Sequence, residues 1–351
     1  MKLVMRLVLV VMLSVISVST AAAVAIPGLD LDRLPEWKVT SSSLGGTLLL
    51  SDSPEMVEND GILYQDKVVG TVRLFFYHVN ASRDVKKMAV LLENKGTQTA
   101  HVKISQATLG GPSNSWMKVG KETQVAYFSE KQASQLSIPP GGAVPLSANL
   151  DEIAIVPNML VNGIYDFEVD HPITVTTMML PVTEDSFRFT QTATVLASDE
   201  WHLRGTFVGA NRQITPARDY NPLADGAVGI TLADNEIDLY LKGIDATDGS
   251  EVRNYGNYGV VYQVLLPSKK GGKIAYYLAP VGGSYAGAIG INHPDVTWSP
   301  VTTPRDRLYF GDTRKKDLAF LGTYESGDPL SFMFSPPGAS NLPVKIVILP
   351  Q

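Results

Sequence analysis

Aromatic residues with polar groups gather in the second half of this chain of 351 residues. Ten of the 14 tyrosines lie at or beyond Tyr220. Flat, amphipathic rings stack on sugar faces or form protein interfaces, and their hydroxyls add hydrogen bonds. We therefore predict a ligand-binding surface formed by Tyr255, Tyr258, Tyr285, Trp298 and Tyr309. The alternative is that these rings fill sheet positions, because aromatic residues are common in strands.

Three carboxylates surround Gly249 in a short acidic loop, namely Asp245, Asp248 and Glu251. Calcium is a hard cation that takes oxygen ligands, and closely spaced carboxylates supply them. The spacing does not match the EF-hand pattern. The loop therefore indicates either a structural calcium site or a solvent-exposed turn. Apart from this possible calcium, the sequence predicts no cofactor.

The segment 282–286 approaches the nucleophile elbow G-x-S-x-G, and His293 and Asp295 follow it. That elbow requires a sharp turn from a strand into a helix. The chain lacks the alternation of helices and strands in which the elbow occurs, so a glycine-rich turn between strands is the favoured interpretation.

Two carboxylate doublets, Glu184–Asp185 and Asp199–Glu200, are the remaining candidates for acid–base chemistry on glycosides. Adjacent residues on a strand point to opposite faces of the sheet, which favours strand ends over a catalytic pair. We therefore predict no catalytic residue. An extracellular hydrolase acting on a carbohydrate or an ester remains the alternative hypothesis.

Strand signals recur along the chain between turn residues, which is typical of an all-β protein. Residues 72–79 are largely apolar at both alternate sets of positions, which predicts a central strand buried on both faces. We expect strands over 46–50, 68–79, 87–93, 99–105, 165–169, 173–180, 187–196, 258–266, 273–280, 308–310, 318–324, 330–334 and 344–349.

Three local patterns predict other elements. Residues 88–93 and 101–104 are joined by Asn and Gly residues that suit a hairpin turn. Residues 119–131 favour one short helix. Residues 236–244 favour another, since Asp234 or Asn235 can cap it and apolar residues recur on one face.

Composition changes near residue 200, where the tyrosine-rich part begins. We place a domain boundary there and divide the chain into four segments. Residues 1–25 are a predicted signal peptide and 26–45 a linker. Residues 46–200 are a predicted Ig-like β-sandwich, and 201–351 a second β-rich domain with one short helix.

The first residues have the layout of a secretory signal. Lys2 and Arg6 precede an apolar run over 7–18, and small residues over 21–25 offer cleavage sites. We expect cleavage and export, with an uncleaved anchor as the alternative. No later apolar run reaches about 18 residues, so no transmembrane segment is expected after cleavage.

Composition excludes several classes of protein. The chain has no cysteine, which excludes disulfides, thiolate metal sites and a cysteine nucleophile. A formal net charge of -6 and a pI near 5.4 argue against binding to nucleic acid. A mean hydropathy of +0.05 argues against disorder throughout the chain.

Five stretches, 72–80, 89–96, 243–259, 305–312 and 330–343, resemble a group of secreted bacterial proteins. That group is described as copper amine oxidase-like, or as bearing a copper amine oxidase N-terminal domain. The resemblance covers most of the mature chain. It implies a β-rich protein associated with the cell envelope.

The oxidase activity suggested by that description is not expected here. The quinone of a copper amine oxidase forms from the Tyr of T-x-x-N-Y-[DE], and an H-x-H pair with a distant His holds copper. Around Tyr255 the chain has Glu251 in place of Thr and Gly256 in place of the acid. No two of the five histidines are within 20 positions of each other.

Together these features predict a secreted, non-catalytic protein of the cell envelope or extracellular matrix. The expected partner is a cell-wall polysaccharide or a surface protein, bound through the aromatic-rich second domain.

Overall fold

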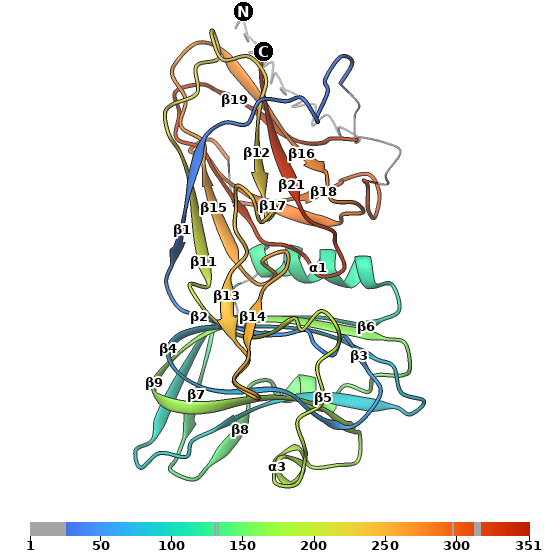
Figure 1. Ribbon diagram of the computed structural model, residues 1–351. Helices are drawn as coiled ribbons and strands as arrows, with labels where there is room; N and C mark the ends of the chain where they lie inside the picture. The colour runs from blue at the N-terminus through green and yellow to red at the C-terminus, as the bar shows by residue number, and fades with distance from the viewer. Residues whose placement is uncertain (1–25, 130, 132, 297, 312–316) are drawn as a thin grey trace, which may run out of the picture.

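The computed structural model describes residues 26–351 except 130, 132, 297 and 312–316. The predicted signal peptide, residues 1–25, lies outside the described residues. Strands dominate the fold, which confirms the all-β prediction. Figure 1 shows two β bodies stacked one above the other, with helix α1 (Trp116–Ser129) between them.

We call the first of these the one-sheet body, because an 11-stranded sheet builds it. Its main path runs β14-β13-β10-β2-β4-β9-β5-β8, while β3 pairs with β4 and β6 pairs with β7 and β9. The strands are β2 (Thr47–Ser51), β3 (Met56–Val57), β4 (Gly61–Asn80), β5 (Lys86–Glu93), β6 (Ala100–Ser113), β7 (Ser134–Ile138), β8 (Ala143–Pro145), β9 (Leu160–Pro181), β10 (Arg204–Val208), β13 (Lys242–Ile244) and β14 (Glu251–Arg253).

The other is the two-sheet body, a sandwich of a 6-stranded and a 4-stranded sheet. The 6-stranded order is β1-β11-β15-β20-β17-β18, and the 4-stranded order is β12-β21-β16-β19. The strands are β1 (Val39–Leu44), β11 (Asn211–Pro216), β12 (Val228–Leu232), β15 (Val261–Leu265), β16 (Lys273–Pro280), β17 (Gly287–Asn292), β18 (Pro300–Thr303), β19 (Ala319–Glu325), β20 (Ser331–Phe334) and β21 (Val344–Pro350).

Two short helices, α2 (Ala148–Glu152) and α3 (Ser186–Thr190), complete the fold. The helix predicted over 119–131 is confirmed as α1, beginning and ending a few residues earlier. Across the described residues, we find no helix with the length and apolar character needed to cross a membrane.

Residues 72–80 of strand β4 are buried on both faces because each face serves a different core. Val72 and Leu74 belong to the core of the one-sheet body. Phe75 and Tyr77, which point to the opposite face, belong to a core that continues into the two-sheet body. This alternation explains the continuous apolar run, and it confirms the predicted central, doubly buried strand.

The predicted hairpin of 88–93 and 101–104 is wrong. Strands β5 and β6 do not pair with each other, and both pair with the long strand β9. β5 aligns with the second half of β9 and β6 with the first half. The turn at Asn94 therefore carries the chain from one half of β9 to the other.

The helix predicted over 236–244 is also wrong, and the described part of residues 201–351 contains no helix. Asp234 does accept the backbone N–H of Ile237 and Asp238, as a helix cap would. However, the Asp238 side chain turns inward, where it accepts hydrogen bonds from Arg212 and Ala233 N–H. This buried pairing holds the segment in a compact loop that ends in β13.

The strand predicted over 187–196 is replaced by α3 and a turn. Asp185 caps α3 by accepting the backbone N–H of Arg188 at 2.9 Å. In the predicted carboxylate doublet Glu184–Asp185, the Asp185 side chain therefore has a local structural role, because a capping side chain satisfies N–H groups at the start of a helix.

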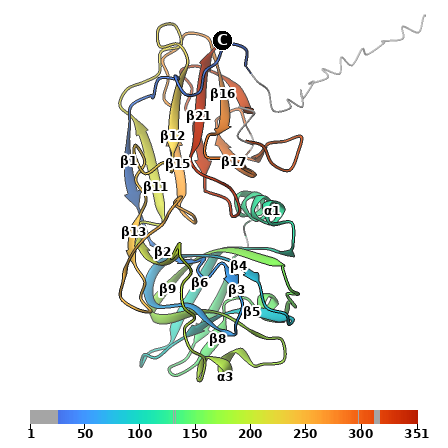
Figure 2. The ribbon, with the colours of Figure 1, turned by 45° about the vertical axis from the view of Figure 1, so that its right-hand side comes forward.

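Strand pairing crosses the boundary predicted at residue 200. Strand β1 lies in the segment predicted as a linker, and it pairs with β11 of the two-sheet body. Strand β10 follows residue 200, and it pairs with β2 of the one-sheet body. In the same N-terminal segment Leu31, Leu34 and Trp37 are buried. The chain therefore passes between the bodies more than once (Figures 1 and 2).

Candidate functional site

A cleft of about 780 Å³ opens where α1 meets both bodies. The one-sheet body contributes residues of β6 and β9, and the two-sheet body contributes residues of β15, β17 and β20. The lining residues are Ser105, Gln106, Tyr127, Phe128, Ser129, Lys131, Asp166, Gln263, Asn292, Trp298, Ser331 and Met333.

Trp298 is held in this cleft by contacts with both its ring N–H and its six-membered ring. The ring N–H donates a hydrogen bond of 2.7 Å to the backbone carbonyl of Phe128 in α1. The six-membered ring of the indole lies on β17, where a Cβ added to Gly290 would come within 2.5 Å of its Cη2 atom. The side chain remains 42% exposed. A glycine in β17 thus allows a fixed ring whose surface stays accessible to a ligand.

Asp166 is the carboxylate of the cleft, and it is already paired. Arg73 donates to both of its oxygens, from Nε at 2.7 Å and from Nη2 at 3.0 Å. The Tyr127 hydroxyl donates to it at 2.6 Å. Burial alone would lower the pKa of Arg73, but Tyr127 and Asp166 raise that pKa above its usual value. The guanidinium therefore stays charged.

The lining suits polar recognition better than proton transfer. The side chains of Gln263 and Asn292 are exposed at the cleft, and amides both donate and accept hydrogen bonds. Gln106 reaches the carbonyl of Tyr127 at 2.8 Å. The carboxylate of Asp166, committed to Arg73 and Tyr127, is not placed to act as a general base.

Of the five aromatic residues predicted from the sequence, Trp298 lines this cleft and the other four lie elsewhere. Tyr285 is fully buried against Phe310, so it fills the core. Tyr258 is half-buried, and its hydroxyl donates to the carbonyl of Ser340 at 2.7 Å. These two residues follow the alternative of sheet and core filling.

Tyr255 and Tyr309 are exposed, at 46% and 49%. Tyr255 packs edge-on against Tyr240, in the loop that precedes β13. Tyr309 lies in the segment after β18. Neither residue lines the Trp298 cleft, so the five rings do not form a single platform.

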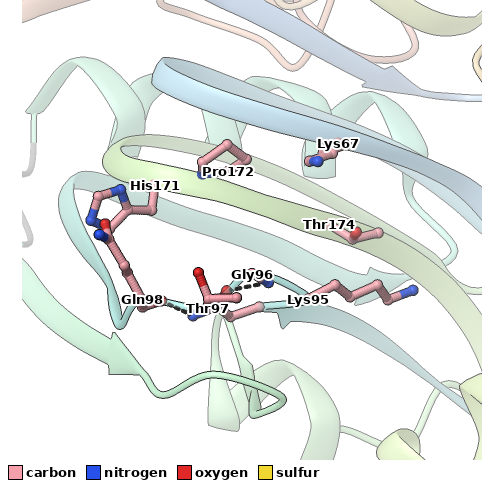
Figure 3. Close-up of a pocket in the computed structure, with 9 residues that line it drawn as sticks. Lys67, Lys95, Gly96, Thr97, Gln98, His171, Pro172 and Thr174 are labelled. Carbon is pink, nitrogen blue, oxygen red and sulfur yellow. Dashed lines mark hydrogen bonds between the residues drawn. The ribbon is translucent and has the colours of Figure 1, made fainter.

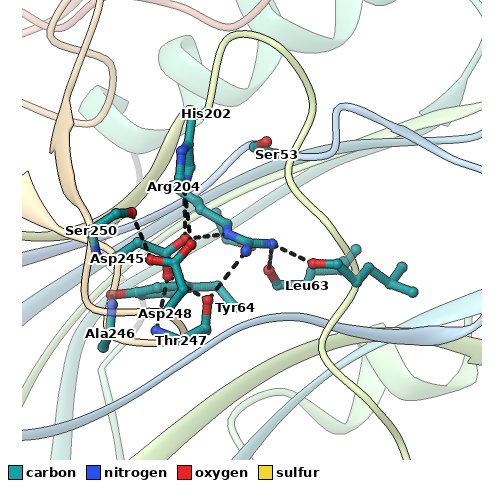
Figure 4. A network of polar contacts seen from close by, with 12 residues as sticks. Ser53, Leu63, Tyr64, His202, Arg204, Asp245, Ala246, Thr247, Asp248 and Ser250 are labelled. Atoms are coloured by element: carbon teal, nitrogen blue, oxygen red, sulfur yellow. Dashed lines mark hydrogen bonds and ion pairs between the residues drawn. The ribbon is translucent and has the colours of Figure 1, made fainter.

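The acidic loop at Asp245 forms the polar network shown in Figure 4. Asp245 is fully buried, and one of its oxygens accepts from Arg204 Nε at 2.6 Å and from His202 at 2.8 Å. Its other oxygen accepts from Thr247. Burial raises the pKa of Asp245, but the hydrogen bonds from Thr247, Arg204 and His202 hold it below its usual range.

This network does not fit the predicted calcium site. Asp245, Asp248 and His202 offer ligand atoms within 4.8 Å of one another, but Glu251 is exposed on β14 and outside the group. The Arg204 guanidinium already supplies the positive charge that a cation would bring. The loop is therefore tied to the one-sheet body by an ion pair.

A second grouping, His293, Asp295 and Asp328, was not predicted because Asp328 is distant in the sequence. His293 Nδ1 accepts the backbone N–H of Asp295 at 3.2 Å, so the proton of a neutral ring resides on Nε2. Nε2 is buried and has no partner among the described residues. Neither nitrogen then offers a free lone pair to a metal.

A smaller pocket of about 300 Å³ lies in the one-sheet body (Figure 3). The loop 94–98 and the bend of β9 at His171 form it, with Lys67 and Thr174. Lys95 pairs with Glu93 at 3.1 Å. The lining carries no Trp, Tyr or Phe ring on which a sugar could stack.

Carboxyl groups also gather after β2. Burial raises the pKa of Asp52 well above its usual value, and the charges of Glu55 and Asp199 add to the shift. Burial and Asp199 raise the pKa of Glu55. Asp52 Oδ1 has no partner within the part of the chain that the structure describes. Only Asp199 of this group was singled out from the sequence.

The glycine-rich segment 282–286 is not a nucleophile elbow. It leads into strand β17 and not into a helix. Its Tyr285 forms a bridge with Phe310, which buries the segment against the core.

A scan against protein-family models and a search of curated proteins find no match. Among solved structures, the CUB1-EGF-CUB2 domains of rat MASP-1 match with 10% identity and a TM-score of 0.21, over 90% of this chain and 98% of that one. Vicilin from tomato, Solanum lycopersicum, matches with 8% identity and a TM-score of 0.15, over 86% and 85%. Oxalate decarboxylase from Lactobacillus farciminis matches with 8% identity and a TM-score of 0.14, over 88% and 87%. Similarities at these TM-scores carry no argument about fold or function.

Proposed function

We propose that this protein is a secreted, non-catalytic component of the cell envelope or extracellular matrix that binds a polysaccharide in the Trp298 cleft. The observation that carries the proposal is the fixed, accessible indole of Trp298 beside the amides of Gln263 and Asn292. Aromatic rings stack on the apolar faces of sugars, and side-chain amides bond their hydroxyls.

The rigidity of the ring supports this proposal. The bond to Phe128 and the contact with Gly290 fix the indole before any ligand arrives. A binding group that is already ordered loses less conformational entropy when a ligand binds. The volume of about 780 Å³ suits a short stretch of a polymer better than a single small ion.

The expected location supports a cell-wall polysaccharide as the ligand. The layout of residues 1–25 predicts export, and the resemblance to secreted bacterial proteins described as copper amine oxidase-like implies an envelope-associated role. A surface protein remains the second proposed partner, since exposed aromatic residues also occur at protein interfaces.

Co-sedimentation of the mature chain with purified cell-wall and polysaccharide fractions tests the proposal. We expect Trp298→Ala to lower the affinity about two- to tenfold, because a ring contact contributes roughly 0.5–1.5 kcal/mol beyond its buried area. Trp201→Ala is the matched control, since Trp201 is 62% exposed and lies outside the cleft. Equal loss in both variants, or no binding to any fraction, would reject the proposal.

A hydrolase acting on a carbohydrate or an ester is the second candidate, and the carboxyl group of Asp52 favours it. A carboxyl with a raised pKa keeps its proton to a higher pH than an ordinary Asp does, and a carboxylic acid beside a second carboxylate can act as a general acid. The assay is release of reducing ends or of acid from the fraction that the chain binds. Release that Asp52→Asn abolishes, while binding is retained, would support this candidate; no release would leave binding as the function.

A further inference from the structure

Strand β1 is an open edge of the two-sheet body. Within the described part of the chain it pairs with β11 alone, and it lies at the outside of the molecule in both views (Figures 1 and 2). Five of its six residues are exposed. An unpaired edge presents free N–H and C=O groups that can pair with another strand.

The hydrogen bonds to β11 show which backbone groups of β1 point outward. Ala217 N–H donates to the carbonyl of Lys38, and the Thr40 hydroxyl donates to the carbonyl of Thr215. The first contact places the inward-facing backbone groups on Lys38 and therefore on Thr40, and Pro216, which lies opposite Val39, has no N–H to donate. Because an antiparallel ladder alternates, the groups of Val39, Ser41 and Ser43 face away from β11.

This edge lacks the features that usually prevent pairing between molecules. The sequence of β1 is VTSSSL, with no charge and no proline. By comparison β8 and β18 contain proline, and β14 contains both Glu and Arg. Natural edges are commonly protected by charged residues or proline. β1 is therefore free to accept a further strand.

Exposed aliphatic side chains adjoin the same edge. Leu44 ends β1 at 45% exposure, and Val208 beside it is 84% exposed. A Cβ on Gly209 would contact Ser43, which shows that the end of β10 adjoins β1. Leu239 is 61% exposed in a loop bonded to Arg212, the residue opposite Ser43. A partner strand would cover part of this apolar rim.

We propose that β1 pairs with β1 of a second copy of this chain. The two strands run antiparallel, and the twofold axis passes between the two Ser41 residues. In this register Ser41 faces Ser41 of the other copy, and Val39 faces Ser43. All three residues have outward backbone groups, so each facing pair can exchange two hydrogen bonds. No charged side chains within β1 are brought together. The two 6-stranded sheets then form one continuous sheet.

A second copy fits this edge because the edge is complementary to itself. Facing residues on an antiparallel pair share one face of the sheet, and a twofold axis normal to the sheet preserves that face. In a register centred on Ser41, the facing residues of the two copies therefore lie on the same face of the joined sheet. Neutral hydroxyl residues on both sides create no repulsion at the axis.

Sedimentation velocity over about 1–100 µM tests the pairing in the mature chain. We expect a dimer for the wild type and a monomer for Ser41→Pro, which removes an outward N–H and leaves the β11 ladder intact. A monomer at every concentration, as expected if the edge instead awaits a different chain, would overturn the proposal. So would a wild-type dimer that Ser41→Pro leaves unchanged.

A charge exchange tests the register. Ser41→Lys and Ser41→Glu should each be monomeric alone, because like charges then meet at the axis, and an equimolar mixture should form a heterodimer. Ser137→Lys is the matched control, since Ser137 is exposed on β7, another neutral edge strand, and it should leave the dimer intact. A mixture that stays monomeric would reject the register centred on Ser41.

Discussion

Gly290 decides where the indole of Trp298 can lie. A Cβ at this position would approach the ring within 2.5 Å, so Gly290→Ala must displace it. We expect polysaccharide binding to weaken about tenfold, with the overpacking costing roughly 1–3 kcal/mol of stability. Binding titrations with parallel denaturant unfolding would separate the two effects. Unchanged affinity in Gly290→Ala would show that the ring position is unimportant.

Asp52 is expected to make stability depend on pH. Because burial raises its pKa in the folded state, its neutral form stabilises the fold at low pH, and that stability is lost as pH rises through the raised pKa. Asp52→Asn should therefore gain stability relative to the wild type at about pH 8 and lose that advantage at about pH 4, near the pKa of an Asp in the unfolded chain. Urea midpoints at both values measure this, with the exposed Asp84→Asn as control. Parallel pH profiles for Asp52→Asn and the wild type would contradict it.

His78 should make the stability of the fold depend on pH in the opposite direction to Asp52. It is fully buried between Ser51 and the carbonyl of Pro54, and burial lowers its pKa to about 4. The unfolded chain then binds the proton more readily, so stability should fall as pH decreases from about 6.5 towards 4. His78→Gln should flatten that part of the stability profile, which acid titration followed by circular dichroism would detect. An acid limb of unchanged steepness would contradict this assignment.

Helix α1 is the element that joins the two bodies. Gln124 is buried in it and accepts the backbone N–H of Ala288 at 2.6 Å, while Lys121 Nζ donates to the carbonyl of Pro304. A Cβ on Gly120 would lie 1.9 Å from the carbonyl oxygen of Gly338. Gly120→Ala should therefore destabilise the protein by at least about 1–3 kcal/mol, although alanine favours helices. Glu122→Ala, on the exposed side of α1, is the control, and equal stability of both variants would refute this role.

The elements that the sequence predicted correctly are those whose pattern is local. Residues 72–79 are largely apolar at both alternate sets of positions, and this part of β4 is buried on both faces for that reason. The 236–244 helix failed because Asp238 is held by Arg212, a partner on β11. The hairpin at Asn94 failed because β9, which pairs with both strands, begins only at Leu160. Both errors come from contacts between distant segments, which periodicity does not report.

In the candidate site, too, residue type predicted a single feature, and contacts between distant segments determine the rest. Trp298 was recognised because its residue type suits ligand binding. Its neighbours Asp166, Gln263 and Asn292 come from three different strands, and only the fold brings them together. Tyr285 has the same residue type as an accessible tyrosine, yet it is fully buried. Exposure depends on the packing of the whole molecule, so residue type alone could not separate these cases.

At the scale of the whole molecule, the bodies should unfold together. The chain crosses between them, and Arg73 on β4 also donates to the carbonyls of Ala210 and Gly259. We expect one calorimetric transition for the wild type. Arg73→Leu leaves the half-buried Asp166 without its cation, and should cost about 3–5 kcal/mol. Two separate transitions in the wild type would show that the bodies are independent.

The central claim is that a polysaccharide occupies the cleft between the bodies. Hydrogen–deuterium exchange of the mature chain, with and without the polysaccharide fraction that it binds, tests the location directly. Bound ligand should slow exchange in β17 and in the last turn of α1 and leave the loop 94–98 unchanged. Protection confined to that loop, or to the segment around Tyr255, would contradict the account.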